Sequence, residues 1–417
     1  MDKQAVLSYG KKWKNTTLNT KIFYTDSERG LPSAVILYNP TVGDRLWDKQ
    51  FFIQNKIERK NKKIEFNWVS KYNYSWKKYL SPNFHNINQK IEDIYHQQTL
   101  YNSLAFSYQL AERWKLFYSS DYDFSWLKSN VEEHATPIRN TFLNVIGTSY
   151  QFKKFKVETN LLYTTINENT KINEKNSVQK GKLTPSISIG YKPIWERDLR
   201  LRFSYKQSYR YPTFNDLYYV RVGNINLRPE LATQWNTGIN YLFKGQDLFF
   251  IQKLNLKLDA FLYEIEDKIV AIPTQNLFVW SMQNFGRVQT KGFEAYINIY
   301  FKQYKHFLVD LSVGYSFQQA LDKTNPNSST YNHQIPYIPF ETSNSHININ
   351  YKKWVLSWNY TYAGHRFFLA ENTYKNTLHA WQLHDIGLEY KNIKQKYTWR
   401  IKSSVNNILN TDYQVII

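Results

Sequence analysis

The sequence contains no cysteine. This absence excludes disulfide scaffolds, thiol nucleophiles and thiolate metal sites together. Long apolar runs are also missing, and the mean hydropathy of the 417 residues is −0.60. A transmembrane helix needs about 20 consecutive apolar residues, so helical membrane spans are excluded. Membrane-spanning strands are not, because every second residue of such a strand can be polar.

Linkers, low-complexity tracts and heptad repeats are absent as well, so one continuous architecture is expected. The sequence has no glycine-rich phosphate loop and no nucleophile elbow, which argues against an enzyme and leaves no catalytic residues. Acidic and histidine residues are dispersed, so no resident metal or cofactor is predicted. The opening Met1-Asp2-Lys3-Gln4 is followed by no apolar run, so no export signal is predicted either.

The formal net charge is +20. Such an excess is typical of proteins that bind nucleic acid, an anionic ligand or an anionic membrane surface. It is also what AT-rich coding would give, since lysine, asparagine, isoleucine and tyrosine are all heavily used. Arginine, which is preferred for phosphate and base recognition, is sparse beside lysine, and the lysines form no clustered motif. No nucleic-acid partner is therefore predicted.

Alternation of apolar and polar residues is the dominant pattern. One stretch interleaves polar residues with five apolar ones: Leu254, Leu256, Leu258, Ala260 and Leu262. Residues at every second position share one face of a strand, so such a stretch has an apolar and a polar face. About seventeen stretches of this kind follow one another. Together with 34 tyrosines and 13 tryptophans suited to interfacial girdles, they predict an all-β fold, a transmembrane antiparallel β-barrel.

Two soluble folds compete with this interpretation. A propeller would repeat a blade signature every ~40–50 residues, and none is found. The strands of soluble sandwiches are about half as long as these.

Tight and long connections between the stretches alternate. Tight connections are predicted at 59–62, 111–113, 153–154, 194–197, 303–305, 352–353 and 392–395, with a slightly longer one at 245–252. Long connections are predicted at 26–45, 77–97, 128–139, 167–182, 209–233, 267–287, 319–342 and 366–380. Outer-membrane barrels have short periplasmic turns and longer external loops. The first predicted strand, near 13–24, and the last, near 396–406, would then both run outward.

Several passages resemble those of TonB-dependent outer-membrane receptors. The longest contains Ser208-Tyr209-Arg210-Tyr211-Pro212-Thr213-Phe214-Asn215-Asp216-Leu217-Tyr218, then Gly223-Asn224-Ile225-Asn226-Leu227-Arg228-Pro229-Glu230 and Gly238. The others are Asn284-Phe285-Gly286 with Lys291-Gly292-Phe293-Glu294, Gly30-Leu31-Pro32, and Asn407 with Tyr413 near the end. Ser33 departs from the family, which usually has a second glycine there. The first loop and residues 362–415 are similar to the vitamin B12 branch.

The resemblance implies a barrel of about 22 strands whose lumen is filled by an N-terminal plug. Residues 1–417 would form one β-barrel domain that is incomplete at both ends, with the plug, its TonB-contacting box, about four first strands and the closing strand missing. The implied partners are outer-membrane lipid, the TonB complex through the absent plug, and a small solute such as cobalamin or a ferric siderophore. The expected location is the outer membrane, and the expected state is a monomeric barrel.

Candidate solute-binding residues come from the predicted external loops and lumen positions. They are Tyr218, Tyr219, Arg221, Trp280, Arg287, Arg366 and Phe367, each of which could instead belong to a girdle or to loop packing. The resembling residues are interpreted as structural: Gly30, Pro32, Pro212, Leu217, Tyr218, Asn224, Leu227, Pro229, Glu230, Gly238, Asn284, Gly286, Gly292, Glu294, Asn407 and Tyr413.

The leading hypothesis is thus active import of a scarce, bulky solute by a receptor of which this chain is the barrel portion. A passive outer-membrane pore, a non-functional receptor remnant and a soluble carbohydrate-binding β protein remain as alternatives. TonB-independent conductance would favour the pore, and purification without detergent would favour the soluble protein.

Overall fold

The computed structural model describes residues 2–31, 43–82, 90–131, 135–170, 178–220, 222–244, 250–273, 280–394 and 397–414. Its first strands are β1 (Lys3–Trp13), β2 (Thr16–Gly30), β3 (Arg45–Lys60), β4 (Ile64–Ser81), β5 (Ile91–Ala111), β6 (Trp114–Ser129), β7 (Ile138–Phe152), β8 (Phe155–Asn169), β9 (Val178–Tyr191) and β10 (Asp198–Arg210). After helix α1 (Phe214–Tyr218) come β11 (Glu230–Lys244), β12 (Ile251–Pro273), β13 (Trp280–Phe301), β14 (Phe307–Asp322), β15 (Glu341–Tyr351), β16 (Trp354–Ala363), β17 (Arg366–Phe367), the 3₁₀ turn η1 (Tyr374–Asn376), β18 (Thr377–Leu378), β19 (Trp381–Ile393) and β20 (Thr398–Val405). Within these ranges, no helix has both the length and the apolar character needed to cross a membrane.

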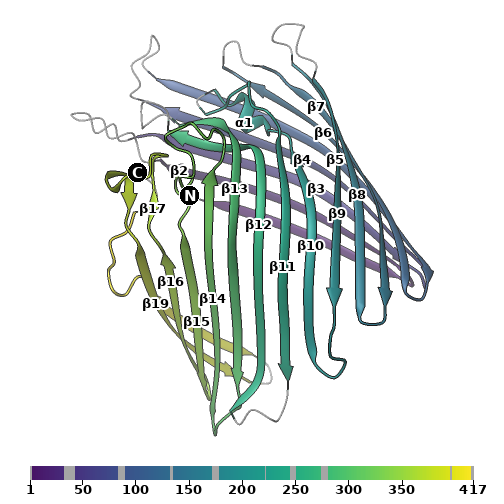
Figure 1. Ribbon diagram of the computed structural model, residues 1–417, viewed down its shortest axis with the longest axis vertical. Helices are drawn as coiled ribbons and strands as arrows, with labels where there is room; N and C mark the ends of the chain where they lie inside the picture. Colours follow the sequence, from purple (N-terminus) through teal and green to yellow (C-terminus); the bar gives the residue numbers. More distant parts are fainter. Residues whose placement is uncertain are drawn as a thin grey trace.

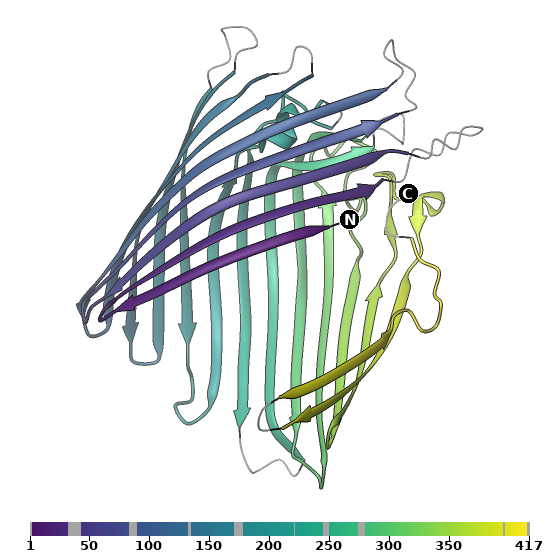
Figure 2. The same cartoon turned by 180° about the vertical axis from the view of Figure 1, so that it is seen from behind.

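Eighteen of the strands form one antiparallel sheet in which each strand pairs with the next along the chain. The small β17–β18 hairpin lies within the β16–β19 connection, so β16 pairs directly with β19. The sheet curls strongly, with its tight turns at one end and its long connections at the other (Figures 1 and 2). The predicted all-β antiparallel architecture is confirmed.

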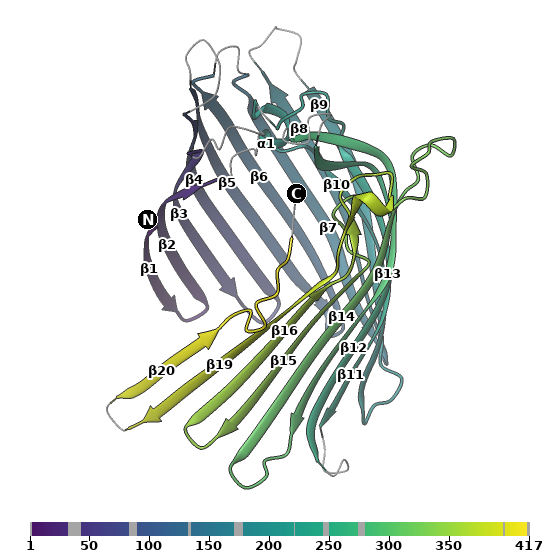
Figure 3. The ribbon, with the colours of Figure 1, turned by 90° about the vertical axis from the view of Figure 1, so that its left-hand side faces the viewer.

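The sheet has two edges. Among the described residues, β1 pairs only with β2, and β20 pairs only with β19. Figure 3 places these two strands at opposite margins of the curled sheet, so the barrel wall is not closed. Backbone N–H and C=O groups along both margins are therefore available for pairing.

The first strand of the sheet is one that the alternation did not predict. We expected the first strand near 13–24, but β1 precedes it and pairs with β2 from Lys3↔Asp26 to Trp13↔Thr16. Ala5, Val6 and Leu7 are adjacent rather than alternating, which hides the two-residue period on which the prediction depends.

The two faces of the sheet differ as the alternation predicts. Phe106, Tyr118, Ile146 and Leu161 form one row across β5–β8, and each is 39–63% exposed. The opposite face is polar: on β6, the Asp121 carboxylate accepts hydrogen bonds from the hydroxyls of Tyr101 at 2.9 Å and Ser103 at 2.6 Å. The apolar face suits lipid and the polar face suits a lumen.

Several predicted loops are shorter than expected because the strands continue past the apolar band. The connection predicted at 267–287 was mostly wrong, since β12 extends to Pro273 and β13 begins at Trp280. In this extension the apolar residues Ile269, Val270 and Ala271 follow one another, so both faces of β12 carry apolar residues. Where both faces are alike, alternation disappears although pairing continues.

One pair of neighbouring strands is joined over only part of its length. β9 and β10 share six paired positions, from Leu201↔Tyr191 to Lys206↔Ser186, whereas β10 and β11 are paired from Asp198 to Arg210. Pro185 lies immediately beyond the last pair and has no N–H to donate. Proline in a sheet is found where one side of the strand lacks a partner. Beyond Ser186, toward the long-connection end, the described residues of β9 and β10 are therefore not paired, and we call this interruption of the ladder the seam.

Candidate functional site

The connection between β10 and β11 contains helix α1 and lies at the long-connection end of the sheet (Figure 1). We call residues 211–220 and 222–229 the crossing loop. Its helix α1 begins with a capping box, in which Thr213 and Asp216 each accept a hydrogen bond from the other's backbone N–H. Arg210 adds an ion pair with Asp216 at 3.0 Å. These contacts hold a helix of only five residues, which would not be stable alone.

The first part of the crossing loop packs on β5 and β6. Phe214 is buried against Tyr95 and Leu127, and all three are at most 5% exposed. Tyr219 stacks on Tyr95, with 4.1 Å between ring centroids and 10° between planes. The Val220 N–H donates to the Tyr95 hydroxyl at 3.2 Å.

A buried ion pair anchors the same part of the loop to β7 and β8. Arg139 pairs with Glu168, and their side chains are only 12% and 2% exposed. Arg139 also donates to the Pro212 carbonyl at 2.9 Å, and Tyr218 donates its hydroxyl to Glu168. The Arg139 guanidinium lies 4.6 Å from the ring centroids of both Tyr211 and Phe214. A buried carboxylate with this many partners is satisfied, and removing one partner should be costly.

The second part of the crossing loop is tied to β12 and β13. Asn284 accepts from the Arg228 N–H at 2.8 Å and donates to the Arg228 carbonyl at 3.0 Å. The Met282 N–H donates to the Val222 carbonyl at 2.8 Å, and Glu230 accepts from the Ile269 N–H at 3.0 Å. The strands β5–β8 and β12–β13 lie on either side of β9–β11. The loop therefore spans the inner side of the wall at the long-connection end of the sheet, which we call the mouth.

The tyrosines of the crossing loop are held neutral. Burial raises the pKa of Tyr211 to about 12, and the nearby Glu168 carboxylate adds to the rise. Burial, followed by the bond to Glu168, raises the pKa of Tyr218 further, and burial likewise raises that of Tyr219. A phenol in an unfolded chain ionises near pH 10. The neutral phenols therefore stabilise the loop fully below about pH 10, and this contribution is lost as pH rises through the folded-state values.

We expect the absorbance difference between wild type and Tyr211→Phe, recorded at 295 nm during alkaline titration, to show its step near pH 12. The cause is burial, because the phenolate would have to be desolvated beside Glu168. A step near pH 10 would show that Tyr211 is open to water and that the loop does not pack as described.

The predicted solute-binding residues are dispersed rather than gathered. Tyr218 and Tyr219 lie together in the crossing loop, where Glu168 and Tyr95 engage them. Arg221 lies outside the described residues, as does the side chain of Trp280. Arg287 is on the face of β13 opposite the fully buried Val288, so it points away from the lumen.

The last two candidates belong to another pair of loops. Arg366 is 4% exposed and donates to the Gln414 carbonyl, and Phe367 lies edge-on to Phe340 at 6.3 Å. The Phe367 carbonyl accepts from the Tyr337 N–H at 2.7 Å, which joins the β14–β15 and β16–β19 connections. Phe367 packs within this junction, and Arg366 links it to the segment after β20.

Most of the residues interpreted as structural pack against or bind named neighbours. Pro212, Leu217 and Leu227 are buried, and Asn224 and Asn284 bind backbone groups. A Cβ at Gly292 would lie 2.1 Å from the Phe317 carbonyl oxygen, and one at Gly238 would lie 2.1 Å from the Asp259 carboxylate. The remaining positions are Gly30 at the end of β2, Pro229 before β11, Gly286 beside Thr324, Glu294 opposite Asp259, Asn407 bound to Asp385, and Tyr413 against Trp381. Pro32 lies outside the described residues.

Sequence reasoning missed the residues that hold the crossing loop. Tyr95, Arg139 and Glu168 come from three strands and share no local pattern. It also missed three exposed apolar side chains of this loop, Val220, Val222 and Ile225, which are 51%, 39% and 68% exposed. Three aliphatic β-branched residues within six positions of a loop were the available signal. No cluster of potential metal ligands occurs among the described residues.

A family model described as TonB dependent receptor-like, beta-barrel matches residues 4–408. The chain belongs to this family. Over 86 residues, or 21% of its length, it is 35% identical to the vitamin B12 transporter BtuB of Vibrio vulnificus, and that segment is 13% of the transporter. This match supports the predicted resemblance to the vitamin B12 branch of the family.

Solved structures of TonB-dependent receptors have the same fold. The ferric preacinetobactin receptor BauA of Acinetobacter baumannii superposes with a TM-score of 0.74 at 12% identity, over 98% of this chain and 68% of the receptor. The ferric citrate transporter FecA in its unliganded form superposes with a TM-score of 0.75 at 13% identity, over 99% of this chain and 66% of that chain. The chain thus spans about two thirds of these receptors. At such identities the likeness establishes the fold, a transmembrane β-barrel.

Proposed function

We propose that this chain is the barrel portion of an outer-membrane receptor that imports a scarce, bulky solute, cobalamin or a ferric siderophore, with energy supplied through TonB. The observation that carries the proposal is the family match over residues 4–408. The polar inner face and apolar outer face of the sheet suit a solute path through a membrane. The protein acts as a transporter and not as an enzyme.

The solute is met at the mouth by the crossing loop. Its exposed Val220, Val222 and Ile225 offer apolar contact surface, while Arg139, Glu168 and Tyr95 hold the loop in position behind them. Tyr218 and Tyr219 support this surface from beneath. Arg366 and Phe367 hold the neighbouring loop junction.

A second part of the proposal concerns the open margins. Unpaired backbone groups in hydrocarbon cost several kcal/mol each, so β1 and β20 require partners. Residues 1–417 form one barrel domain, incomplete at both ends, and additional strands together with a plug complete it. TonB binds through that plug.

Uptake in cells that produce the protein tests the transport function. We expect disruption of the gene to reduce uptake of either labelled cobalamin or a labelled ferric siderophore at least tenfold, with an equal loss when TonB is removed. Val222→Asp combined with Ile225→Asp should reduce uptake, whereas Trp195→Asp, an exposed residue of the β9–β10 turn, should not. Uptake that persists without TonB would favour a passive pore, and no change for either solute would favour a remnant.

A further inference from the structure

The outer face of β2–β5 carries an ordered set of aromatic and charged residues at the long-connection end. Three registered rows run across these strands, and they are Tyr24–Phe51–Tyr74–Gln98, Asp26–Lys49–Trp76–His96 and Glu28–Trp47–Lys78–Ile94. The face is the outer one because His96 has the same parity on β5 as the exposed Leu100 and Leu104, and the opposite parity to the buried Tyr95. Aromatic residues at this position form the girdle of a membrane barrel.

Two lysines and two tryptophans form a crossed arrangement within this girdle. Lys49 lies 5.2 Å from the ring centroid of its neighbour Trp76, and Lys78 lies 5.3 Å from that of Trp47. We call these four residues the Lys–Trp square. Each ammonium group is held against the wall by a ring face, which is favourable for a cation that must remain at a membrane interface.

The cations around the square outnumber the carboxylates. Arg45, Lys49, Lys78 and Lys90 face Asp26, Glu28 and Glu92. Asp26 pairs with Lys49 at 3.4 Å, and Glu92 is shared between Lys78 and Lys90. Four cations against three carboxylates leave the patch with an excess positive charge. The carboxylates orient the lysines, and an anion of higher charge can compete for them.

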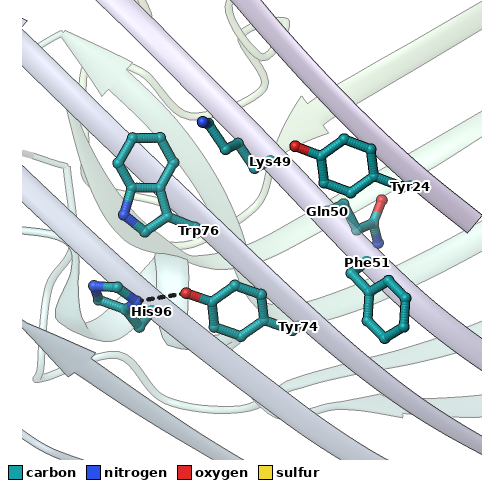
Figure 4. Close-up of a pocket in the computed structure, with 7 residues that line it drawn as sticks. All are labelled: Tyr24, Lys49, Gln50, Phe51, Tyr74, Trp76 and His96. Atoms are coloured by element: carbon teal, nitrogen blue, oxygen red, sulfur yellow. Dashed lines mark hydrogen bonds between the residues drawn. The ribbon is translucent and has the colours of Figure 1, made fainter. Parts of the chain in front are cut away.

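An open pocket of about 280 Å³ shares Lys49 and Trp76 with the square and extends from it toward the apolar band. Tyr24, Phe51, Tyr74, Trp76 and His96 line it, and the Tyr74 hydroxyl and a His96 ring nitrogen are 2.9 Å apart (Figure 4). On β5, His96 lies four residues, or about 13 Å along the strand, from the exposed Leu100, and Tyr74 pairs with Gln98, two residues from it. The pocket is therefore at the interfacial end of the apolar band. Its ring faces can stack on sugar rings or on the upper part of acyl chains.

We propose that the Lys–Trp square and its pocket form a binding site for a phosphorylated glycolipid of the outer leaflet. Lys49 and Lys78 bind phosphate groups, and the aromatic pocket receives the sugar rings and the start of the acyl chains. The site is on the outer wall, so it is independent of solute import through the lumen. Because it joins β2, β3, β4 and β5, an occupied site braces these strands against one another.

The test measures lipid binding to protein extracted in mild detergent from the outer membrane that contains it. The probes are bisphosphorylated lipid A, the same glycolipid without phosphates, and phosphatidylglycerol, with bound lipid counted by native mass spectrometry. We expect Lys49→Gln with Lys78→Gln to weaken binding of the bisphosphorylated glycolipid at least tenfold, and Lys49→Arg with Lys78→Arg to retain it.

Lys21 and Lys71 provide a matched control on the inner face. They lie on β2 and β4, 5.8 Å and 4.4 Å from the ring centroid of Phe52 on β3, so they repeat the lysine–aromatic contact in the same part of the sheet. Lys21→Gln with Lys71→Gln should leave lipid binding unchanged. An equal loss in both pairs would reduce the site to a general charge effect and overturn the proposal. Equal binding of the dephosphorylated glycolipid or of phosphatidylglycerol would overturn it as well.

Discussion

Replacing Arg139 with methionine should release the crossing loop from the barrel wall. The substitution leaves the Glu168 carboxylate, 2% exposed, without its cationic partner, and it removes the bond to the Pro212 carbonyl. Breaking a buried pair on one side costs about 3–5 kcal/mol. Hydrogen exchange at the amides of Leu217 and Val220, which donate to Thr213 and Tyr95, should accelerate by about 10²–10³-fold.

Two further variants show whether the loss of hydrogen-exchange protection comes from the unpaired buried charge or from a general loss of packing. Arg139→Met combined with Glu168→Leu removes the unpaired carboxylate and should recover part of the lost protection. Arg287→Met breaks an ion pair whose members are 55% and 39% exposed, so it should cost at most about 1 kcal/mol. Equal effects of Arg139→Met and Arg287→Met would contradict the anchoring role.

The second large effect concerns the open margins of the sheet. The sheet has eighteen strands, an even number, so β1 and β20 run in opposite directions and antiparallel pairing between them would close the barrel. The proposed completion instead places other strands between them. The absence of cysteine makes this question directly testable. With Leu7→Cys and Ile401→Cys introduced together, we expect almost no disulfide in the intact outer membrane, because a disulfide needs Cα atoms within about 7 Å.

A positive control is available on the same strand. Leu7 and Ile22 are paired neighbours on β1 and β2, so Leu7→Cys with Ile22→Cys should cross-link nearly completely on oxidation. Moving the second cysteine to Trp399 or Ser403 tests other registers of β20. Efficient cross-linking at any of these positions would show that the sheet closes on itself and that no further strands complete it.

The sequence predicts a strand where its two faces have different surroundings, lipid on the outer face and the lumen on the inner face. Strands such as β12 were evident where Leu254 to Leu262 alternate with polar residues, because one face meets hydrocarbon. The same strand from Asp267 onward was interpreted as loop, since its consecutive apolar residues Ile269 to Ile272 do not alternate with polar ones. β1 was missed for a related reason, as its adjacent Ala5, Val6 and Leu7 do not alternate.

The candidate site was predictable only where one short segment supplies it. Tyr218, Asn224 and Glu230 stand in a resembling passage, and the structure places all three in or beside the crossing loop. Arg139 and Glu168, which hold Tyr218 and the Pro212 carbonyl, face each other through the β7–β8 register, which no local pattern encodes. Arg287 was chosen because it ends a predicted external loop, but it lies in β13, and the pairing of β13 with β12 and β14 turns its side chain away from the lumen.

The short ladder between β9 and β10 has a consequence for the shape of the mouth. Above Ser186 these two strands share no hydrogen bonds within the described chain, so separating them further there breaks none. The strand ladder therefore does not fix the circumference at the outer end. The crossing loop fixes it, because separating β9 from β10 there would break the bonds of Arg139 to the Pro212 carbonyl and of Tyr218 to Glu168.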